Sequence, residues 1–281
     1  MNEFMRKVNS KAPTVVVLIM CQCLCAEVSA FQLSGGRSRG MGGAISLSSA
    51  TASDYLRAPG IALGDGQWYL EAGAERRFEL KELDAGYLAW AFRRNRAGFS
   101  FGVQQFGRSK GFAEKTARGA VAYYVNKFSL ALIGSFRSYD FGASYSSLNA
   151  VSLGLSAGLT TRHALVSIVV DNLNRPSFVS SAPEEEIEGS LYAEARGAKL
   201  RTSARITLRE NKKPVLGLGQ IVPVGKAADL FWGVSSHPLI YGGGLEIRQS
   251  KYGIIYSGSY HPTLGYSQNI SIVYYSGAPG N

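Results

Sequence analysis

Short segments in which apolar and polar residues alternate follow one another from Gln67 to Tyr275. In the clearest of them, 151–160, valine, leucine and alanine occupy the odd positions, and serine, glycine and threonine occupy the even ones. Because successive strand residues point to opposite faces, such a strand has one apolar face and one small, polar face. A succession of these segments, separated by turn residues, predicts an all-β fold, an antiparallel transmembrane β-barrel.

The spacing of these segments gives an expected number of strands. We count about thirteen candidates between turn signals. They begin near Trp68, Tyr87, Phe99, Val121, Phe128, Val151, Leu165, Lys199, Val215, Leu230, Leu239, Tyr252 and Tyr266. Bacterial single-chain barrels have an even number of strands, so an odd count means that one strand is missed or wrongly assigned. We expect about fourteen strands, with about twelve as the alternative.

The connections between the candidate strands differ in length. Short connections are expected at Arg93–Ala97, Asn126–Lys127 and Thr160–His163, and long ones at Gly107–Thr116, Arg137–Asn149 and Asp171–Ser190. Short periplasmic turns that alternate with longer outer loops are typical of membrane barrels. The lengths therefore support an up-and-down barrel.

Residues 1–30 have the order of regions found in a secretory signal peptide. Basic residues precede an apolar stretch, Pro13–Cys25, which is too short to span a membrane comfortably. Residues Val28–Ala30 then form a cleavage site, which would leave Phe31 at the start of the mature chain. An uncleaved anchor helix is the alternative. Cleavage would remove every cysteine, which excludes a disulfide framework and a thiolate metal site.

The stretch from Phe31 to Gly66 differs from the rest of the chain. It is rich in glycine, serine and alanine and has no sustained alternation. Glycine permits positive φ and close backbone packing, so Gly40–Gly43 could form a compact segment inside a barrel. A lumen of about fourteen strands is wide enough to need a plug. The expected organisation is a signal peptide at 1–30, an N-terminal plug segment at 31–66 and the barrel at 67–281.

Two sets of residues are candidates for the surface that faces the lumen. The first set consists of small residues, which would leave room for a plug or a ligand: Ser152, Gly154, Ser156 and Gly158. The second set consists of basic residues on the alternating segment near 198–209: Lys199, Arg201 and Arg205.

The remaining chemistry argues against an enzyme and against nucleic-acid binding. The formal net charge is +10, but the basic residues are dispersed and form no compact stripe, so anionic lipid headgroups or a basic lumen explain the charge better. The three histidines lie in predicted turns. The segment Gly102–Ser109 lacks both the lysine and the strand-to-helix context of a phosphate loop. We therefore expect no catalytic residues, no cofactor and no metal site.

Three stretches carry a resemblance to one barrel family. Residues Gly36–Ala44, followed by Ala52–Asp54 and Arg57–Leu63, resemble the opening of the FadL-like long-chain fatty-acid transporters and of their PorV-type relatives in type IX secretion. The segment Val169–Pro176 is similar to a mid-barrel segment of the family, and His261–Ile272 resembles its last hairpin. In the opening, Arg57–Gly60 stands where the family has an Asn-Pro-Ala-Gly-Leu-like turn, and the asparagine is missing. In the mid-barrel segment, Asn174 stands in place of a glycine.

The resemblance implies that an N-terminal motif plugs the barrel. Its residues would be Gly40, Met41, Gly42, Gly43, Ala44, Pro59 and Gly60. In FadL-like transporters, such a hatch gates the passage of a hydrophobic ligand. In PorV-type barrels, the resemblance implies an outer-membrane partner that receives secreted proteins.

Three functions are compatible with such a barrel. A secretion-associated or structural barrel predicts a plugged lumen and a protein-binding outer face. A passive transporter of small hydrophobic molecules predicts an apolar pocket between plug and wall. A general porin predicts an open polar channel lined by charges such as Lys199, Arg201 and Arg205. The short chain and modest loops favour the first function, with the second as the alternative.

The expected location is the outer membrane of a Gram-negative-type bacterium, reached through the Sec pathway. The expected partners are outer-membrane lipid and lipopolysaccharide, together with secreted proteins or a hydrophobic small molecule.

Overall fold

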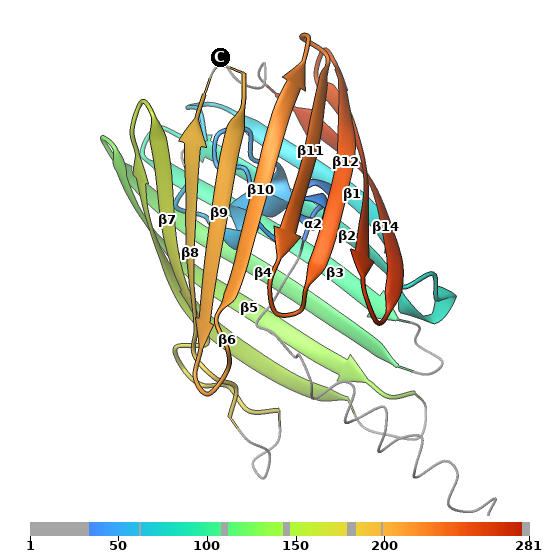
Figure 1. Ribbon diagram of the computed structural model, residues 1–281. Coiled ribbons are helices and arrows are strands. Elements are labelled where there is room, and N and C mark those ends of the chain that lie inside the picture. Colours follow the sequence, from blue (N-terminus) through green and yellow to red (C-terminus); the bar gives the residue numbers. More distant parts are fainter. Residues whose placement is uncertain are drawn as a thin grey trace, which may run out of the picture. The chain divides into compact units, whose positions relative to one another are not determined.

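The computed structural model describes residues 34–61, 63–107, 112–142, 147–178, 184–197 and 199–276. Within them, fourteen antiparallel strands close into a barrel in which each strand pairs with its sequence neighbours and β1 pairs with β14 (Figure 1). This confirms the expected fourteen-strand barrel. No helix among the described residues is long and apolar enough to cross a membrane.

The strands are β1 Trp68–Arg76, β2 Asp84–Arg94, β3 Ala97–Gly107, β4 Ala113–Val125, β5 Phe128–Asp140, β6 Leu148–Thr160, β7 Ala164–Asp171, β8 Glu188–Arg196, β9 Arg201–Arg209, β10 Val215–Val224, β11 Ala228–Ser235, β12 Ile240–Gln249, β13 Tyr252–His261 and β14 Gly265–Tyr275. A short 3-10 helix, η1, covers Lys81–Leu83.

The strands bury one face and expose the other. In β5, Leu130 and Leu132 are each 67% exposed, whereas the neighbouring Ala131 and Ile133 are buried. Large apolar side chains on the outer face and small or polar ones on the inner face are the arrangement expected of a wall that borders lipid. The alternation read from the sequence therefore marks the two sides of the barrel wall.

One strand, β8, is missing from the sequence-based count, which placed its first residues in a long connection at Asp171–Ser190. The buried face of β8 carries Glu188, Tyr192 and Glu194, and its other face is mostly glycine and alanine. Neither face is a row of large apolar residues. The segment therefore lacks the alternation by which the other strands were found.

The prediction that Lys199 faces the lumen is wrong. A backbone hydrogen bond from Gly197 N to Leu200 O, 3.0 Å long, closes a turn between β8 and β9. Strand β9 begins only at Arg201, and Lys199 is exposed in the turn before it. The alternation was extended across a turn that the sequence pattern did not mark.

The two ends of the barrel differ in their connections. The turns β2–β3, β4–β5 and β12–β13 contain only two residues between paired strands, and Asn95, Asn126 and Ser250 in them have positive φ values of 54°, 53° and 54°. Positive φ suits the tight hairpin turns that match strand twist. We call this end, where β1 begins and β14 ends, the short-turn end, and the opposite end the long-loop end. Short turns are periplasmic in barrels of this kind.

Residues 34–61, which we call the N-terminal segment, lie inside the barrel and contact its inward-facing side chains (Figure 1, blue). The segment contains two short helices, α2 Gly36–Gly40 and α3 Ala52–Arg57. A capping box starts α3, because Thr51 N donates to Asp54 Oδ2 over 3.0 Å and the Thr51 side chain accepts from the helix backbone. Almost every residue of the segment is buried.

Candidate functional site

Carboxylates on the barrel wall hold the backbone of the N-terminal segment. Glu194 of β8 accepts hydrogen bonds from Leu47 N at 2.8 Å and Ser48 N at 3.2 Å. Glu71 of β1 accepts one from Ser53 N at 3.0 Å and a second from the Tyr87 hydroxyl at 2.8 Å. Buried N–H groups are costly when they lack partners. Glu194 supplies partners in an irregular stretch of the segment, and Glu71 supplies one to the first turn of α3, where the helix itself offers none.

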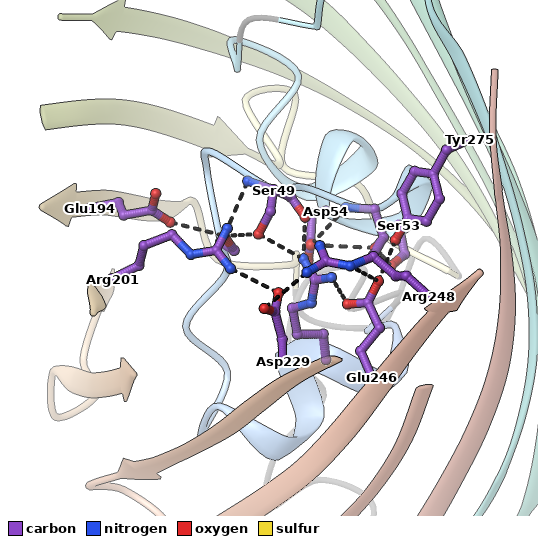
Figure 2. A network of polar contacts seen from close by, with 12 residues as sticks. Ser49, Ser53, Asp54, Glu194, Arg201, Asp229, Glu246, Arg248 and Tyr275 are labelled. Carbon is purple, nitrogen blue, oxygen red and sulfur yellow. Dashed lines mark hydrogen bonds and ion pairs between the residues drawn. The ribbon is translucent and has the colours of Figure 1, made fainter. Parts of the chain in front are cut away.

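A second set of contacts joins α2 to the wall through charged groups (Figure 2). Arg37, which is 1% exposed, forms an ion pair with Glu246 of β12, and it also donates to Ser49 Oγ at 3.0 Å. The other Glu246 oxygen accepts from the Tyr275 hydroxyl at 2.8 Å. The two ionised groups are therefore paired inside the lumen, as buried charges must be.

The ion pairs continue along the wall beside α2. Asp229 of β11, which is fully buried, lies between two arginines: Arg201 at 2.8 Å and Arg248 at 2.9 Å (Figure 2). Arg205 donates to Gly43 O at 3.3 Å and to Thr207 Oγ1 at 2.8 Å. Arg201 and Arg205 thus bind protein groups in the lumen and do not line an open polar channel.

Glycines bring the backbone of the N-terminal segment against the wall. Gly219, Gly233 and Gly242 are register partners on β10, β11 and β12, and they form what we call the glycine row. A Cβ atom on Gly233 would overlap the backbone of Met41, and one on Gly242 would lie 2.7 Å from Gly40 O. The segment can therefore approach the wall this closely only because side chains are absent there.

Residues Met41–Ala44 of the predicted plug motif lie in the same region. Met41 and Ala44 are fully buried, and Gly42 and Gly43 have positive φ values of 63° and 80°. At Gly42, a Cβ atom would meet the backbone of Val234 at 2.5 Å. This turn therefore needs glycine both for its conformation and for its packing.

The turn at Pro59 and Gly60 contacts the opposite wall. The Tyr124 hydroxyl is 3.3 Å from Pro59 O and donates to Ile61 O at 3.0 Å, and Ser129 Oγ donates to Gly60 O at 2.5 Å. A Cβ atom on Gly158 would overlap Gly60 O. Just before the turn, Arg118 Nε donates to Leu56 O at 2.8 Å.

The small residues predicted to face the lumen divide into two groups. Ser156 and Gly158 adjoin Gly60 of the N-terminal segment. Ser152 instead donates to Asn172 Oδ1 at 2.6 Å, and a Cβ atom on Gly154 would meet Asp171 Oδ1 at 2.7 Å. All four are buried on the inner face of β6, but only the first two reach the segment.

Sequence reasoning missed four wall residues that bind the segment, Glu71, Tyr124, Glu194 and Glu246. It also missed Asp229, which pairs with Arg201 and Arg248 on the wall. A signal for most of them was present, because an acidic residue at an inward position of a strand needs a partner inside the barrel. Among the described residues, no cluster of three or more histidine, cysteine or acidic side chains is arranged to hold a metal ion.

An apolar recess lies between the N-terminal segment and strands β2, β3 and β4. On the wall side, Ala91, Ser100 and Ala120 are register partners and form a floor of small residues. On the other side, Tyr55 and Leu63 cover this floor, together with Pro59. The cavity volume of the recess is about 10 Å³, room for about one water molecule. The space is narrow, so a ligand the size of an aromatic ring would require the segment to shift.

One ionisable group of the segment responds to pH near neutrality. Burial raises the pKa of Asp54 to about 6, while the positive charges of Arg37 and Arg57 and the hydrogen bond from Thr51 N act in the opposite direction. The charge of Glu71 adds to the increase. The side chain is 1% exposed, and its Oδ1 atom has no hydrogen-bond partner among the described residues.

We expect the attachment of α3 to weaken as pH rises from 5 to 7.5. Because the pKa of Asp54 is higher in the folded segment than in a free chain, its stabilising contribution is complete at low pH and is lost as pH rises through about 6. Hydrogen exchange of the α3 amides, corrected for the intrinsic rate, should therefore be slower at pH 5 than at pH 7.5. Asp54→Asn should remove this difference, whereas the exposed Asp65→Asn should retain it.

Comparison with known proteins gives the class of the fold. No protein-family model and no curated protein match the chain. Solved structures do match: the toluene transporter TodX of Pseudomonas putida, with a TM-score of 0.61, 10% identity, and 89% of this chain and 99% of that chain covered. The monoaromatic hydrocarbon channel CymD matches with a TM-score of 0.56 and 15% identity, over 87% and 98% of the two chains.

A third match is the outer membrane protein Omp33 of Acinetobacter baumannii, with a TM-score of 0.51 and 7% identity over 75% of this chain and 98% of that chain. Such low identities establish a shared fold and no more. The chain is thus an outer-membrane-type β-barrel with the architecture of transport channels.

Proposed function

We propose that this protein is an outer-membrane channel for small hydrophobic molecules, closed in this structure by its N-terminal segment. The observation that carries the proposal is the apolar recess between the segment and strands β2–β4. Among the three functions compatible with the sequence, the hydrophobic transporter is the one that predicts an apolar pocket in that position.

The comparisons support the same reading. TodX and CymD are described as a toluene transporter and a monoaromatic hydrocarbon channel, and they support the FadL-like side of the resemblance. The secretion-associated function, which the sequence favoured, gains no support from them. The porin reading is disfavoured by the pairing of Arg201 with Asp229 and of Arg205 with Thr207 and Gly43.

The floor of the recess offers a direct test. Replacing Ala120 with leucine adds a branched apolar side chain to a wall of small residues and would fill the space that a ligand needs. We expect Ala120→Leu to reduce uptake of labelled toluene by intact cells by about fivefold or more. A close-packed interior cannot accommodate even one additional methylene group without displacing its neighbours. The measurement is the initial rate of uptake at equal amounts of folded protein.

Ala150→Leu is the matched control. Ala150 is 8% exposed, faces inward from β6 and does not line the recess. If Ala150→Leu lowers toluene uptake as much as Ala120→Leu does, the recess is not part of the pathway. Normal uptake by folded Ala120→Leu protein would contradict the proposal as well.

A further inference from the structure

The short-turn end of the barrel carries basic residues in each of its hairpin turns. At the first three turns these are Arg96, Lys127 and Arg162, together with Arg94, the last residue of β2, and all four side chains are exposed. At the remaining turns they are Lys199, Lys226 and Lys251, together with Arg196, the last residue of β8, and these are also exposed. We call these residues the basic rim.

Acidic residues are almost absent from this end. Among the described residues, the hairpin turns of the short-turn end contain no aspartate or glutamate. Asp65, in the segment that leads into β1, is exposed and accepts a hydrogen bond from Asn95 N at 2.5 Å. The nearest acidic residues on β8 and β11, Glu194 and Asp229, are buried and paired inside the lumen. The rim therefore carries a net positive charge, since eight exposed basic residues face one exposed carboxylate, that of Asp65.

The opposite end of the barrel is different. Exposed charges of both signs are mixed at the long-loop end, where Arg76 pairs with Asp84 at 2.9 Å and Arg175 pairs with Glu210 at 2.6 Å. Among the described residues, the excess of positive over negative charge therefore lies at the short-turn end.

Aromatic side chains on the outer wall lie next to the basic rim. Trp68, the first residue of β1, stacks on Tyr274 with ring centroids 4.7 Å apart, and Tyr274 contacts Tyr252 at 5.2 Å. Tyr252 directly follows Lys251 of the rim. Tryptophan and tyrosine concentrate where a membrane meets water, so this cluster places the rim at the level of lipid headgroups.

We propose that the basic rim binds anionic phospholipid headgroups of the membrane leaflet at the short-turn end. Basic residues beside an apolar anchor attract anionic lipid over distances up to a Debye length. This inference does not depend on the transport function. It concerns the outer surface of the barrel and would hold for a barrel with any cargo.

Fluorescence of Trp68 provides the test. In a Trp90→Phe, Trp232→Phe background, Trp68 is the remaining tryptophan of the chain. The protein would be reconstituted into vesicles of phosphatidylethanolamine and phosphatidylglycerol, with one or the other lipid carrying brominated chains that quench tryptophan. We expect brominated phosphatidylglycerol to quench Trp68 more strongly than its mole fraction predicts.

Two charge-reversal variants with the same total charge distinguish lipid binding by the basic rim from an effect of the protein's total charge. Arg94→Glu, Arg96→Glu, Lys251→Glu changes the two turns on either side of Trp68. It should lower the preference for phosphatidylglycerol by at least about tenfold, since each basic residue at an anionic surface contributes about a factor of five. Lys81→Glu, Lys212→Glu, Lys213→Glu changes the long-loop end and should retain the preference.

Equal quenching of the wild-type background by the two brominated lipids would overturn the proposal. So would an equal loss of preference in the two triple variants. All six substituted side chains are exposed, and folding would be checked by the mobility of the unheated barrel on a denaturing gel.

Discussion

Replacing Glu246 with leucine is expected to detach the N-terminal segment from the wall more strongly than any other single change, at a cost of about 3–5 kcal/mol. Arg37 is 1% exposed, and without the Glu246 carboxylate it becomes a buried charge that has no ion-pair partner among the described residues. Hydrogen exchange of the amides in residues 37–57 should accelerate by about 100-fold or more.

A double variant distinguishes the unpaired charge from damage to the strand. Arg37→Met, Glu246→Leu removes both charges and should recover most of the protection that Glu246→Leu loses, because an ion pair can often be replaced by apolar groups at little cost. The hydrogen bond from the Tyr275 hydroxyl to Glu246 is lost in both variants, so that loss cancels in the comparison. Unchanged exchange in the single variant would show that the ion pair does not hold the segment.

The second large effect is expected from Gly233→Val. The new side chain would overlap the Met41 backbone, and neither the segment nor the glycine row can move without disturbing its neighbours. Overpacking of this kind costs about 1–3 kcal/mol, which corresponds to roughly a 5- to 150-fold increase in the population of the displaced segment. Cells that carry this variant should become sensitive to a large hydrophilic antibiotic such as vancomycin.

Gly134→Val is the control for this substitution. A Cβ atom on Gly134 meets nothing within 4 Å, and the residue lies on the outer face of β5. This variant should leave antibiotic sensitivity at the wild-type level. If the two valine variants behave alike, the glycine row is not what keeps the lumen closed.

The sequence predicted the barrel well because its signal is local. Alternation in a strand such as 151–160 reports directly on which residues face lipid, and the turn residues mark where each strand ends. The failures also have a local cause. The strand β8 has a charged inner face and a small outer face, and Lys199 lies in a turn between two segments that both look like strands.

The site was predicted only in part because its contacts are not local. The stretch Gly40–Gly43 was identified as a compact segment, and glycine is indeed required there for both φ and close packing. Its partners could not be found in the same way. Arg37 and Glu246 are 209 residues apart, and the glycine row becomes visible only when the register of β10, β11 and β12 is known.

The central claim is that the chain carries small hydrophobic molecules across the outer membrane. The most direct test compares a deletion strain with its parent, measuring the initial uptake rate of labelled toluene and the proteins present at the cell surface. The account predicts slower toluene uptake and an unchanged set of surface proteins. Normal toluene uptake with loss of surface proteins would contradict it and would favour a secretion-associated barrel.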